Sequence, residues 1–298
     1  MRAVAVIALT LAASSAAAEP GEHGSAGFEL RLHRGDTEQD EVEHVGFYPS
    51  IVVDGSAQVG GGIEIAAAVA AARTSAVWEN IGGVANGMLS ARTRLARPAW
   101  IAEIEAGIAF PLDRSIPAPD CFPEPENGGD SLVFSYGEDT SCWDRSAYRR
   151  AALHRGAWDI WLWAPDWVTL AATARLETNA RSYLYYAVDV GAGGAVAVTD
   201  AHDGAALIGQ IAPEIGAQLS ARWRAGLRGI AAGVLLDDTS PFLLSLEPFV
   251  AYQRDEVRIR LGLLLPLADL GNEEVPPGQG GYKISENKSL GLGVTAFF

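Results

Sequence analysis

The sequence contains no apolar run long enough for a transmembrane helix. Its most apolar stretch, residues 3–12, falls short of the ~20 residues that a helical span requires, and every later segment of that length carries a charge, a Gly or a Pro. Basic residues are also few, with 22 Lys and Arg against 37 Asp and Glu and a net charge of −15. Such acidity disfavours nucleic acid as a partner. A membrane form of this chain must be a closed β-barrel, because lipid offers no partners to unpaired backbone groups.

Cysteine is equally scarce. The chain has two, Cys121 and Cys142, and both lie in one polar segment rich in Pro, Gly and Asp. In an oxidising compartment we expect them to form a disulfide that closes this segment into a loop. A metal or redox role is the alternative, but two thiols without a nearby His do not complete a usual zinc site. The sequence predicts no metal site and no cofactor.

The N-terminus has the features of a secretory signal peptide. Arg2 precedes the apolar run, and the small residues Ala16, Ala17 and Ala18 follow it. This pattern predicts a signal peptide over residues 1–18 with cleavage after Ala18, and an uncleaved membrane helix is the alternative. No Cys follows the small residues, which argues against a lipid-anchored lipoprotein.

The last eleven residues alternate between two faces and end on an aromatic residue. One face carries Leu290, Leu292, Val294, Ala296 and Phe298, and the other carries Ser289, Gly291, Gly293 and Thr295. Behind an N-terminal signal peptide, this strand resembles the C-terminal assembly signal of bacterial outer-membrane β-barrels. The resemblance implies a Gram-negative outer membrane and recognition of the last strand by the barrel-assembly machinery.

The same alternation recurs upstream and predicts twelve strands in a single antiparallel, up-and-down transmembrane β-barrel formed by residues 19–298. The expected strands lie near 26–34, 44–53, 57–73, 89–95, 100–112, 157–178, 183–190, 214–223, 227–235, 242–253, 257–267 and 289–298. Short turns are expected at 96–99, 224–225 and 253–256. The weakest strands contain Pro49 and the Ala-rich stretch 66–72, which favours a helix on propensity. Residues 157–178 keep one parity across Pro165 and are interpreted as one long strand, with two strands as the alternative.

Aromatic residues sort by depth on the outward face of these strands. Trp100, Trp223, Tyr252 and Phe298 fall at the expected inner ends, and Phe110 and Phe242 fall at the outer rim. Two such belts are typical of interfacial girdles in a membrane barrel. A soluble β-fold, the competing architecture, gives no reason for this sorting.

Long connections are expected at one end only, near residues 35–43, 74–86, 113–156, 199–203, 237–240 and 268–286. Several of them are acidic and rich in turn-forming residues. They form either a solvated exterior or a surface that contacts lipopolysaccharide, through divalent ions, or a partner. A Trp158, Trp161 and Trp163 patch above the rim would stack on a sugar, dock a partner or pack against the disulfide loop.

The face assigned to the lumen is rich in charge. It carries Arg92, Arg94, Arg175, Arg222, Arg228, Arg258 and Arg260, with Glu103, Glu105, Glu177, Glu214 and Glu247 on neighbouring strands. In one interpretation these charges form ion-pair networks that fill a narrow barrel, with Arg92 across from Glu103. In the other, an Arg surplus attracts anions, and Arg222 and Arg228 facing each other across a turn favour this surplus.

A twelve-stranded barrel is intermediate between side-chain-filled barrels and open channels. The layout is similar to that of twelve-stranded, Arg-lined porins for acidic sugars, which implies passive diffusion of small hydrophilic solutes, with anions favoured. The alternative is a non-conducting barrel that binds lipopolysaccharide or a partner through acidic outer loops. A lipid hydrolase is disfavoured, because His23, His33, His44, His154 and His202 show no convincing spacing from a lipid-facing Ser. The sequence therefore predicts no enzyme.

Overall fold

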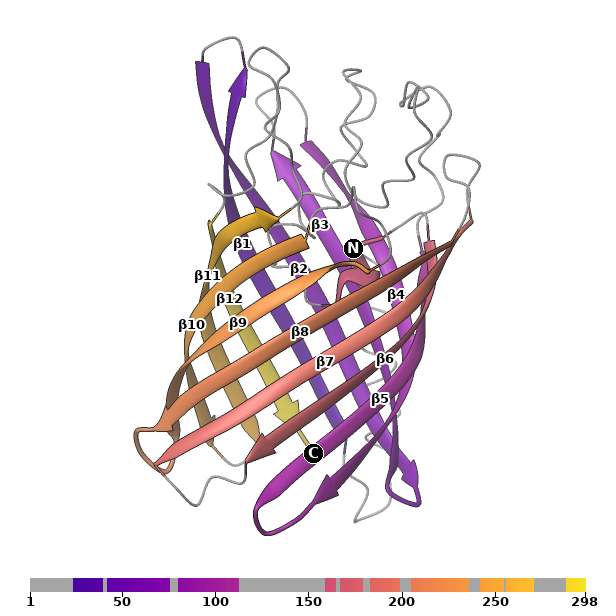
Figure 1. The fold of residues 1–298 in the computed structure, drawn as a ribbon, viewed down its shortest axis with the longest axis vertical. Helices are drawn as coiled ribbons and strands as arrows, with labels where there is room; N and C mark the ends of the chain where they lie inside the picture. The colour runs from indigo at the N-terminus through magenta and orange to yellow at the C-terminus, as the bar shows by residue number, and fades with distance from the viewer. Residues whose placement is uncertain are drawn as a thin grey trace.

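The chain forms a closed barrel of twelve antiparallel strands in a computed structural model (Figure 1). The structure describes residues 24–39, 42–75, 80–112, 159–164, 167–178, 183–198, 205–235, 242–254, 256–270 and 288–298. Each strand pairs with its neighbours in sequence, and β12 closes the barrel against β1. The predicted strand number and topology are confirmed.

The strand bounds follow the alternating pattern of the sequence. The first six strands are β1 (Gly24–Gln39), β2 (Val42–Gly60), β3 (Ile63–Ser75), β4 (Asn80–Ala96), β5 (Trp100–Pro111) and β6 (Trp167–Thr178). The other six are β7 (Leu184–Ala197), β8 (Ala205–Gln218), β9 (Trp223–Val234), β10 (Phe242–Arg254), β11 (Val257–Leu270) and β12 (Lys288–Phe297). The Ala-rich stretch lies within β3 because pairing with β2 and β4 overrides its helical propensity.

Alternate side chains lie on opposite surfaces of the wall. On β11, Leu261 and Leu263 are exposed on the outside, whereas the side chain of Leu264 is completely buried inside. Large apolar residues make up most of the exposed outer positions on the other strands as well. No helix in the part of the chain that the structure describes is long and apolar enough to cross a membrane.

Two short turns differ from the expected ones. The chain turns between β2 and β3 at Gly61 and Gly62, not near residues 54–56, because these glycines adopt positive φ values of 62° and 77° that other residues rarely adopt. Between β8 and β9 the turn spans residues 219–222, and the predicted turn at 224–225 is wrong. Arg224 and Ala225 instead pair with Gln218 and Ala217 on β8.

Two expected outer loops are largely strand. β1 and β2 continue through most of residues 35–43, and their pairing extends to Gln39 and Val42. β3 and β4 pair through Ser75 and Asn80, so only 76–79 remain of the expected loop 74–86. Ladder hydrogen bonds continue wherever two adjacent strands stay side by side, even where the sequence is acidic. Figure 1 shows the β1–β2 hairpin rising above its neighbours.

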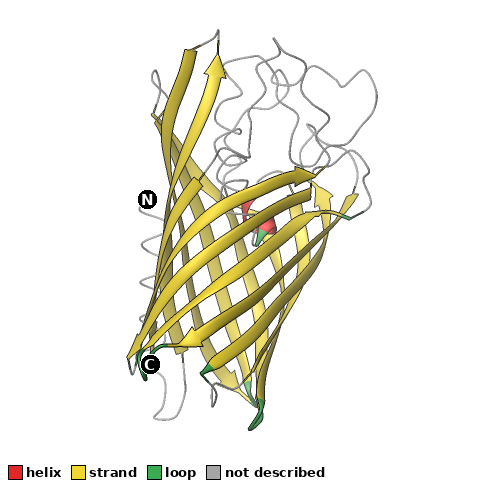
Figure 2. Ribbon diagram, turned by 60° about the vertical axis from the view of Figure 1, so that its left-hand side comes forward, coloured by secondary structure: helices red, strands yellow, loops and turns green. Residues whose placement is uncertain are grey.

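The expected long strand over residues 157–178 is wrong. Residues Ile160–Trp163 form a single 3₁₀ turn, η3, and only Trp167–Thr178 form the strand β6. We call residues 159–164 the plug, because all four η3 side chains are buried in a cluster with residues of the barrel wall. Figure 2 shows this short helix within the barrel rather than above its rim.

Several predictions concern residues outside the described ranges. They include the signal peptide 1–18, the Cys121–Cys142 disulfide, the loop 113–156, Trp158, and His23, His154 and His202. The backbones of His44 and Phe242 lie in β2 and β10, but their side chains are outside the described part of the structure.

Candidate functional site: the barrel interior

The interior contains three layers, which follow one another along the inward face of β8. Ile208 belongs to the cluster around the plug, Glu214 lies in a layer of ion pairs, and Gln218 lines a cavity at the inner mouth. Ile208 and Glu214 are six residues apart and Glu214 and Gln218 are four residues apart, which separates the layers by about 20 Å and about 13 Å along the strand, at ~3.3 Å per residue. The outer half of the interior is therefore apolar and the inner half is charged.

Among the described residues, the ion-pair layer is a balanced network of buried and half-buried charges. Its members are five arginines and five carboxylates, Arg31, Arg175, Arg224, Arg228, Arg260, Glu29, Glu177, Asp189, Glu214 and Glu247. Glu247 is 2% exposed and accepts hydrogen bonds from Arg31 at 3.1 Å and from Arg260 at 3.3 Å. The formal charges of this layer cancel, as a low-dielectric interior requires.

Aromatic rings hold two of these arginines in place. The guanidinium carbon of Arg260 lies 3.7 Å from the centroid of the Phe249 ring, and that of Arg224 lies 5.1 Å from the Tyr185 ring. The Tyr185 hydroxyl donates to Glu214 at 2.9 Å. The Tyr185 ring packs over Gly216, where a Cβ would approach the ring carbon Cζ to 2.5 Å. Gly216 therefore supplies the space that lets Tyr185 reach Glu214.

A second, smaller network lies on β2, β3 and β4. The predicted partner of Arg92 is wrong: Arg92 lies opposite Glu105 in the strand register, not Glu103, and its side chain binds Glu64 with two hydrogen bonds of 2.6 and 2.7 Å. Glu105 instead accepts from the Ser90 hydroxyl. Glu64 lies directly opposite Arg92 in the β3–β4 register, and strand alternation does not encode which residues of two adjacent strands lie opposite each other.

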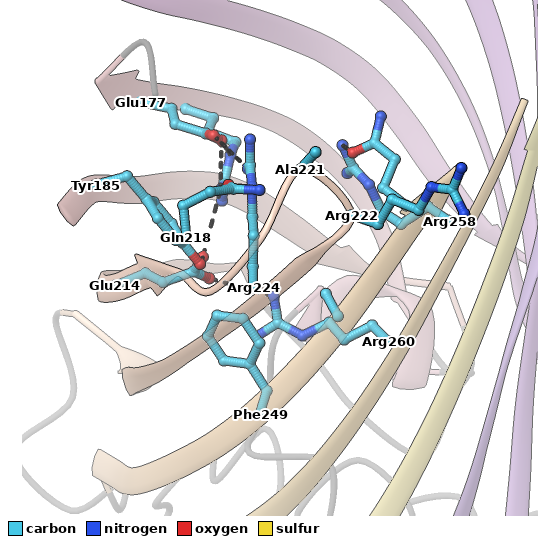
Figure 3. Close-up of a pocket in the computed structure, with 13 residues that line it drawn as sticks. Glu177, Tyr185, Glu214, Gln218, Ala221, Arg222, Arg224, Phe249, Arg258 and Arg260 are labelled. Carbon is cyan, nitrogen blue, oxygen red and sulfur yellow. Dashed lines mark hydrogen bonds and ion pairs between the residues drawn. The ribbon is translucent and has the colours of Figure 1, made fainter. Parts of the chain in front are cut away.

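The inner mouth contains a cavity of about 350 Å³ with an excess of positive charge (Figure 3). We call it the basic vestibule. Its charged lining consists of five arginines and two glutamates, Arg175, Arg222, Arg224, Arg258, Arg260, Glu177 and Glu214. Summed over these lining residues, the formal charge is +3. Arg175, Arg224 and Arg260 also belong to the ion-pair layer, so Arg222 and Arg258 supply the surplus that the described carboxylates do not balance.

Two vestibule arginines make no ion pair with any residue that the structure describes. Arg258 donates to Gln253 at 3.4 Å, and its guanidinium lies 5.7 Å from the centroid of the Phe297 ring. Arg222 lies in the β8–β9 turn, and its backbone carbonyl accepts from Gln253. In Figure 3 the two arginines lie together on one side of the cavity, away from Glu177 and Glu214. This side of the vestibule offers hydrogen-bond donors to an anion, and none of them is occupied by a described carboxylate.

The structure places the remaining predicted residues as follows. Arg94 and Glu103 lie opposite each other in the β4–β5 register. Arg222 does not face Arg228 across a turn, because Arg228 lies within β9 opposite Glu214.

On the outside, Trp100, Trp223 and Phe298 are exposed near the inner ends of strands, and Tyr252 packs against Trp223 with ring centroids 5.0 Å apart. Phe110 is half-buried near the outer end of β5.

Sequence reasoning missed several charged residues of the interior. Arg31, Glu29, Glu64, Asp189 and Arg224 all contact the networks, and none was singled out as a site residue. Arg31, Glu29 and Asp189 each alternate with apolar neighbours, which is the signal that could have identified them. Arg224 was assigned to a turn, so its inward direction could not be deduced.

The plug is held by polar groups of the wall. The Asn86 side-chain amide donates to the carbonyl oxygens of Trp161 at 2.8 Å and Ala164 at 2.7 Å. Gln210 accepts from the backbone N–H of Asp159 at 2.9 Å. Asp159 has a φ of 56°, a left-handed conformation that starts the tight η3 turn. The predicted rim patch is therefore wrong for Trp161 and Trp163, which are buried inside the barrel.

One His–Ser pair lies in the interior. His33 Nε2 is 2.7 Å from Ser50 Oγ, and both side chains are buried between β1 and β2. A catalytic pair must be open to its substrate. We therefore interpret this pair as part of the polar packing of the wall.

The sequence matches no protein-family model and no curated protein. Solved structures with a similar fold include the KdgM porin, with 7% identity, a TM-score of 0.45 and coverage of 91% of this chain and 99% of that chain. The NanC porin shows 7% identity, a TM-score of 0.47 and coverage of 90% and 98%. The COG4313 outer membrane channel from Pseudomonas putida F1 shows 11% identity, a TM-score of 0.49 and coverage of 94% and 97%. At this level of likeness the function must be argued from the residues of this chain.

Proposed function

We propose that this protein is an outer-membrane β-barrel that forms a narrow pore for small, hydrophilic anions. The closed barrel exposes large apolar side chains around its outside, and lipid is the solvent that favours such a surface. A soluble protein rarely exposes so large an apolar area. The membrane location rests on this surface.

The basic vestibule is the observation that carries the pore proposal. A barrel that served only as a structural element would gain nothing from Arg222 and Arg258 facing a cavity while making no ion pair with any described residue. Guanidinium groups remain charged at all physiological pH values and bind carboxylate or phosphate with paired hydrogen bonds. The vestibule would raise the local concentration of anions at the inner mouth.

The plug supports a closed resting state for this pore. Four bulky apolar side chains occupy the outer half of the interior, so solute passage requires the plug to move. The same observation favours the second candidate, a non-conducting barrel that binds lipopolysaccharide or a partner through its acidic outer loops. The two proposals differ in what happens when the plug is reduced in size.

Single-channel recording in planar bilayers tests the pore proposal. We expect rare openings for the wild-type barrel and frequent openings for the double variant Trp161→Ala, Trp163→Ala, because truncating both indoles removes most of the apolar contact that seats the plug. Absence of current from both proteins, after folding is verified, would rule out the pore and leave the non-conducting barrel.

Charge selectivity tests the vestibule. Replacing Arg222 and Arg258 with Gln should lower the anion-to-cation permeability ratio several-fold, since the vestibule charge falls from +3 to +1. Arg260 is a poor choice for this test because it pairs with Glu214 and Glu247, and each of these buried carboxylates would lose one of its arginine partners. Arg97→Gln, in the β4–β5 turn and outside the cavity lining, is the matched control and should leave the reversal potential unchanged.

A further inference from the structure

The barrel wall around the plug is rich in small residues, with Val52, Met88, Trp167 and Ile208 as its larger members. Alanines from seven positions on six strands line the plug cluster, Ala70, Ala72, Ala85, Ala109, Ala171, Ala195 and Ala232. Narrow barrels usually fill their interior with the side chains of the wall itself. Here the wall leaves space, and Ile160, Trp161, Leu162 and Trp163 from a connecting segment occupy it. The wall therefore surrounds a chamber as large as four bulky apolar side chains.

The contact between the plug and the wall is close. A Cβ added to Gly191 would lie 3.0 Å from the Trp161 ring carbon Cη2. An indole ring thus already rests against the bare backbone of β7 and the side chain of Gln210. The chamber therefore already holds a flat aromatic ring.

Some polar atoms of this chamber have no hydrogen-bond partner among the residues that the structure describes. They are Asn86 Oδ1, Thr169 Oγ1, Gln210 Nε2 and Trp161 Nε1, and all are buried. Buried polar atoms without partners are rare and destabilising. The plug therefore covers the apolar surface of the chamber but leaves some of its polar atoms without hydrogen bonds. A bound molecule that carries a few polar atoms could form hydrogen bonds with Asn86, Thr169 and Gln210.

We propose that this chamber, the plug seat, binds the apolar part of the solute, so that the permeating class is amphipathic organic anions with an aromatic or aliphatic body and one acidic group. This inference rests on the proposed pore. The plug occupies the seat as an internal substitute for the solute. The arginines of the basic vestibule attract the anion to the inner mouth, and the seat then takes up its apolar body.

Sulfonates of matched charge test this proposal, because they stay ionised and do not cross lipid as neutral acids. Binding of naphthalene-2-sulfonate and of methanesulfonate is measured by equilibrium dialysis against the protein in lipid nanodiscs, with empty nanodiscs subtracted. In the Trp161→Ala, Trp163→Ala variant we expect naphthalene-2-sulfonate to bind at least about tenfold more tightly than it binds wild type, since emptied apolar cavities bind aromatic molecules. Methanesulfonate should bind equally to both proteins.

A refilled seat provides a further test. Adding Ala232→Phe to the double variant places a ring in the same cluster and should return naphthalene-2-sulfonate binding to the wild-type level. Trp223→Ala removes an indole from the outer surface and should change neither affinity. If the double variant does not fold, Asn86→Ala removes the hydrogen bonds to Trp161 and Ala164 while leaving the indoles intact, and should produce the same preference.

Equal gains for both sulfonates, or no gain for either in a folded variant, would overturn the proposed seat. The readout does not depend on conduction. Tighter naphthalene-2-sulfonate binding without any current would remove the pore and keep the seat, whereas current without a preference for the larger sulfonate would keep the pore and remove the seat.

Discussion

Buried carboxylates each hold more than one arginine in the ion-pair layer. Glu247 binds Arg31 and Arg260 from two different strands, and Glu214 binds Arg260 and the Tyr185 hydroxyl. A charge of this kind is destabilising when it is alone, because it has lost its water, and acceptable when its partners surround it. The loss of one member therefore affects stability through the partners that it leaves behind.

Replacing Glu247 with Gln should lower the free energy of unfolding by roughly 3 kcal/mol, because Arg31 and Arg260 each lose a buried anionic partner. Urea unfolding in lipid vesicles, followed by Trp fluorescence, measures this change. Glu103→Gln is the matched control, since Glu103 makes no ion pair within the described part of the chain, and it should change stability by less than about 0.5 kcal/mol. Equal losses for the two variants would contradict the role given to the network.

For single residues, the sequence predicted which side chains point into the barrel, but it did not predict which residues they bind. Alternation places Arg228, Arg260 and Glu214 on the inward face, as the structure has them. Pairing of Arg92 with Glu64 depends on the relative position of adjacent strands and on side-chain reach, and neither is written in the local pattern. Arg222, which makes no ion pair with a described residue, was misplaced because its turn was placed four residues too late.

Strands and inner turns depend on different local features of the sequence. The strands form where apolar and polar or small residues alternate, and the β2–β3 turn forms where glycine permits a positive φ. At the β2–β3 turn Gly60, Gly61 and Gly62 all have positive φ, and the space around each of them is open. The requirement for glycine at this turn is therefore conformational and not steric.

Replacing Gly62 with Ala should lower the free energy of unfolding by about 1–2 kcal/mol, the usual penalty for an L-residue in the left-handed region. Gly194 on β7 also has open space around it but no positive φ, so Gly194→Ala should be neutral or slightly stabilising. Urea unfolding of the two variants side by side separates the two effects. A loss of the same size at Gly194 would contradict the assignment of the Gly62 effect to its positive φ.

The plug was the element that sequence reasoning could not identify. Trp158 to Leu176 keep one parity by coincidence, which gave the appearance of one long strand. The run Ile160, Trp161, Leu162 and Trp163 carried a contrary signal, because it is apolar on both faces and leaves no residue for a polar lumen. The connecting segment folds inward because alanines from several strands leave space for it inside the barrel. The local sequence of the segment carries no information about these distant residues.

The whole molecule combines an apolar outside with an interior that changes from apolar to charged along its axis. Strand number, topology and the two-faced wall could be predicted from the sequence, because each strand repeats the same period and one face must contact lipid. The order of plug, ion-pair layer and basic vestibule could not be predicted, because it arises from side chains of many strands at the same depth.

Nitroxide scanning of β11 tests the two-faced wall most directly. Single cysteines at residues 257–265, in a Cys121→Ser, Cys142→Ser background, carry a spin label in lipid vesicles, and collisions with oxygen report contact with the bilayer. We expect high oxygen accessibility at Val257, Ile259, Leu261, Leu263 and Leu265 and low accessibility at Arg258, Arg260, Gly262 and Leu264. An alternation of opposite phase, or no alternation along the strand, would contradict a barrel with its apolar face in lipid and its arginines in the lumen.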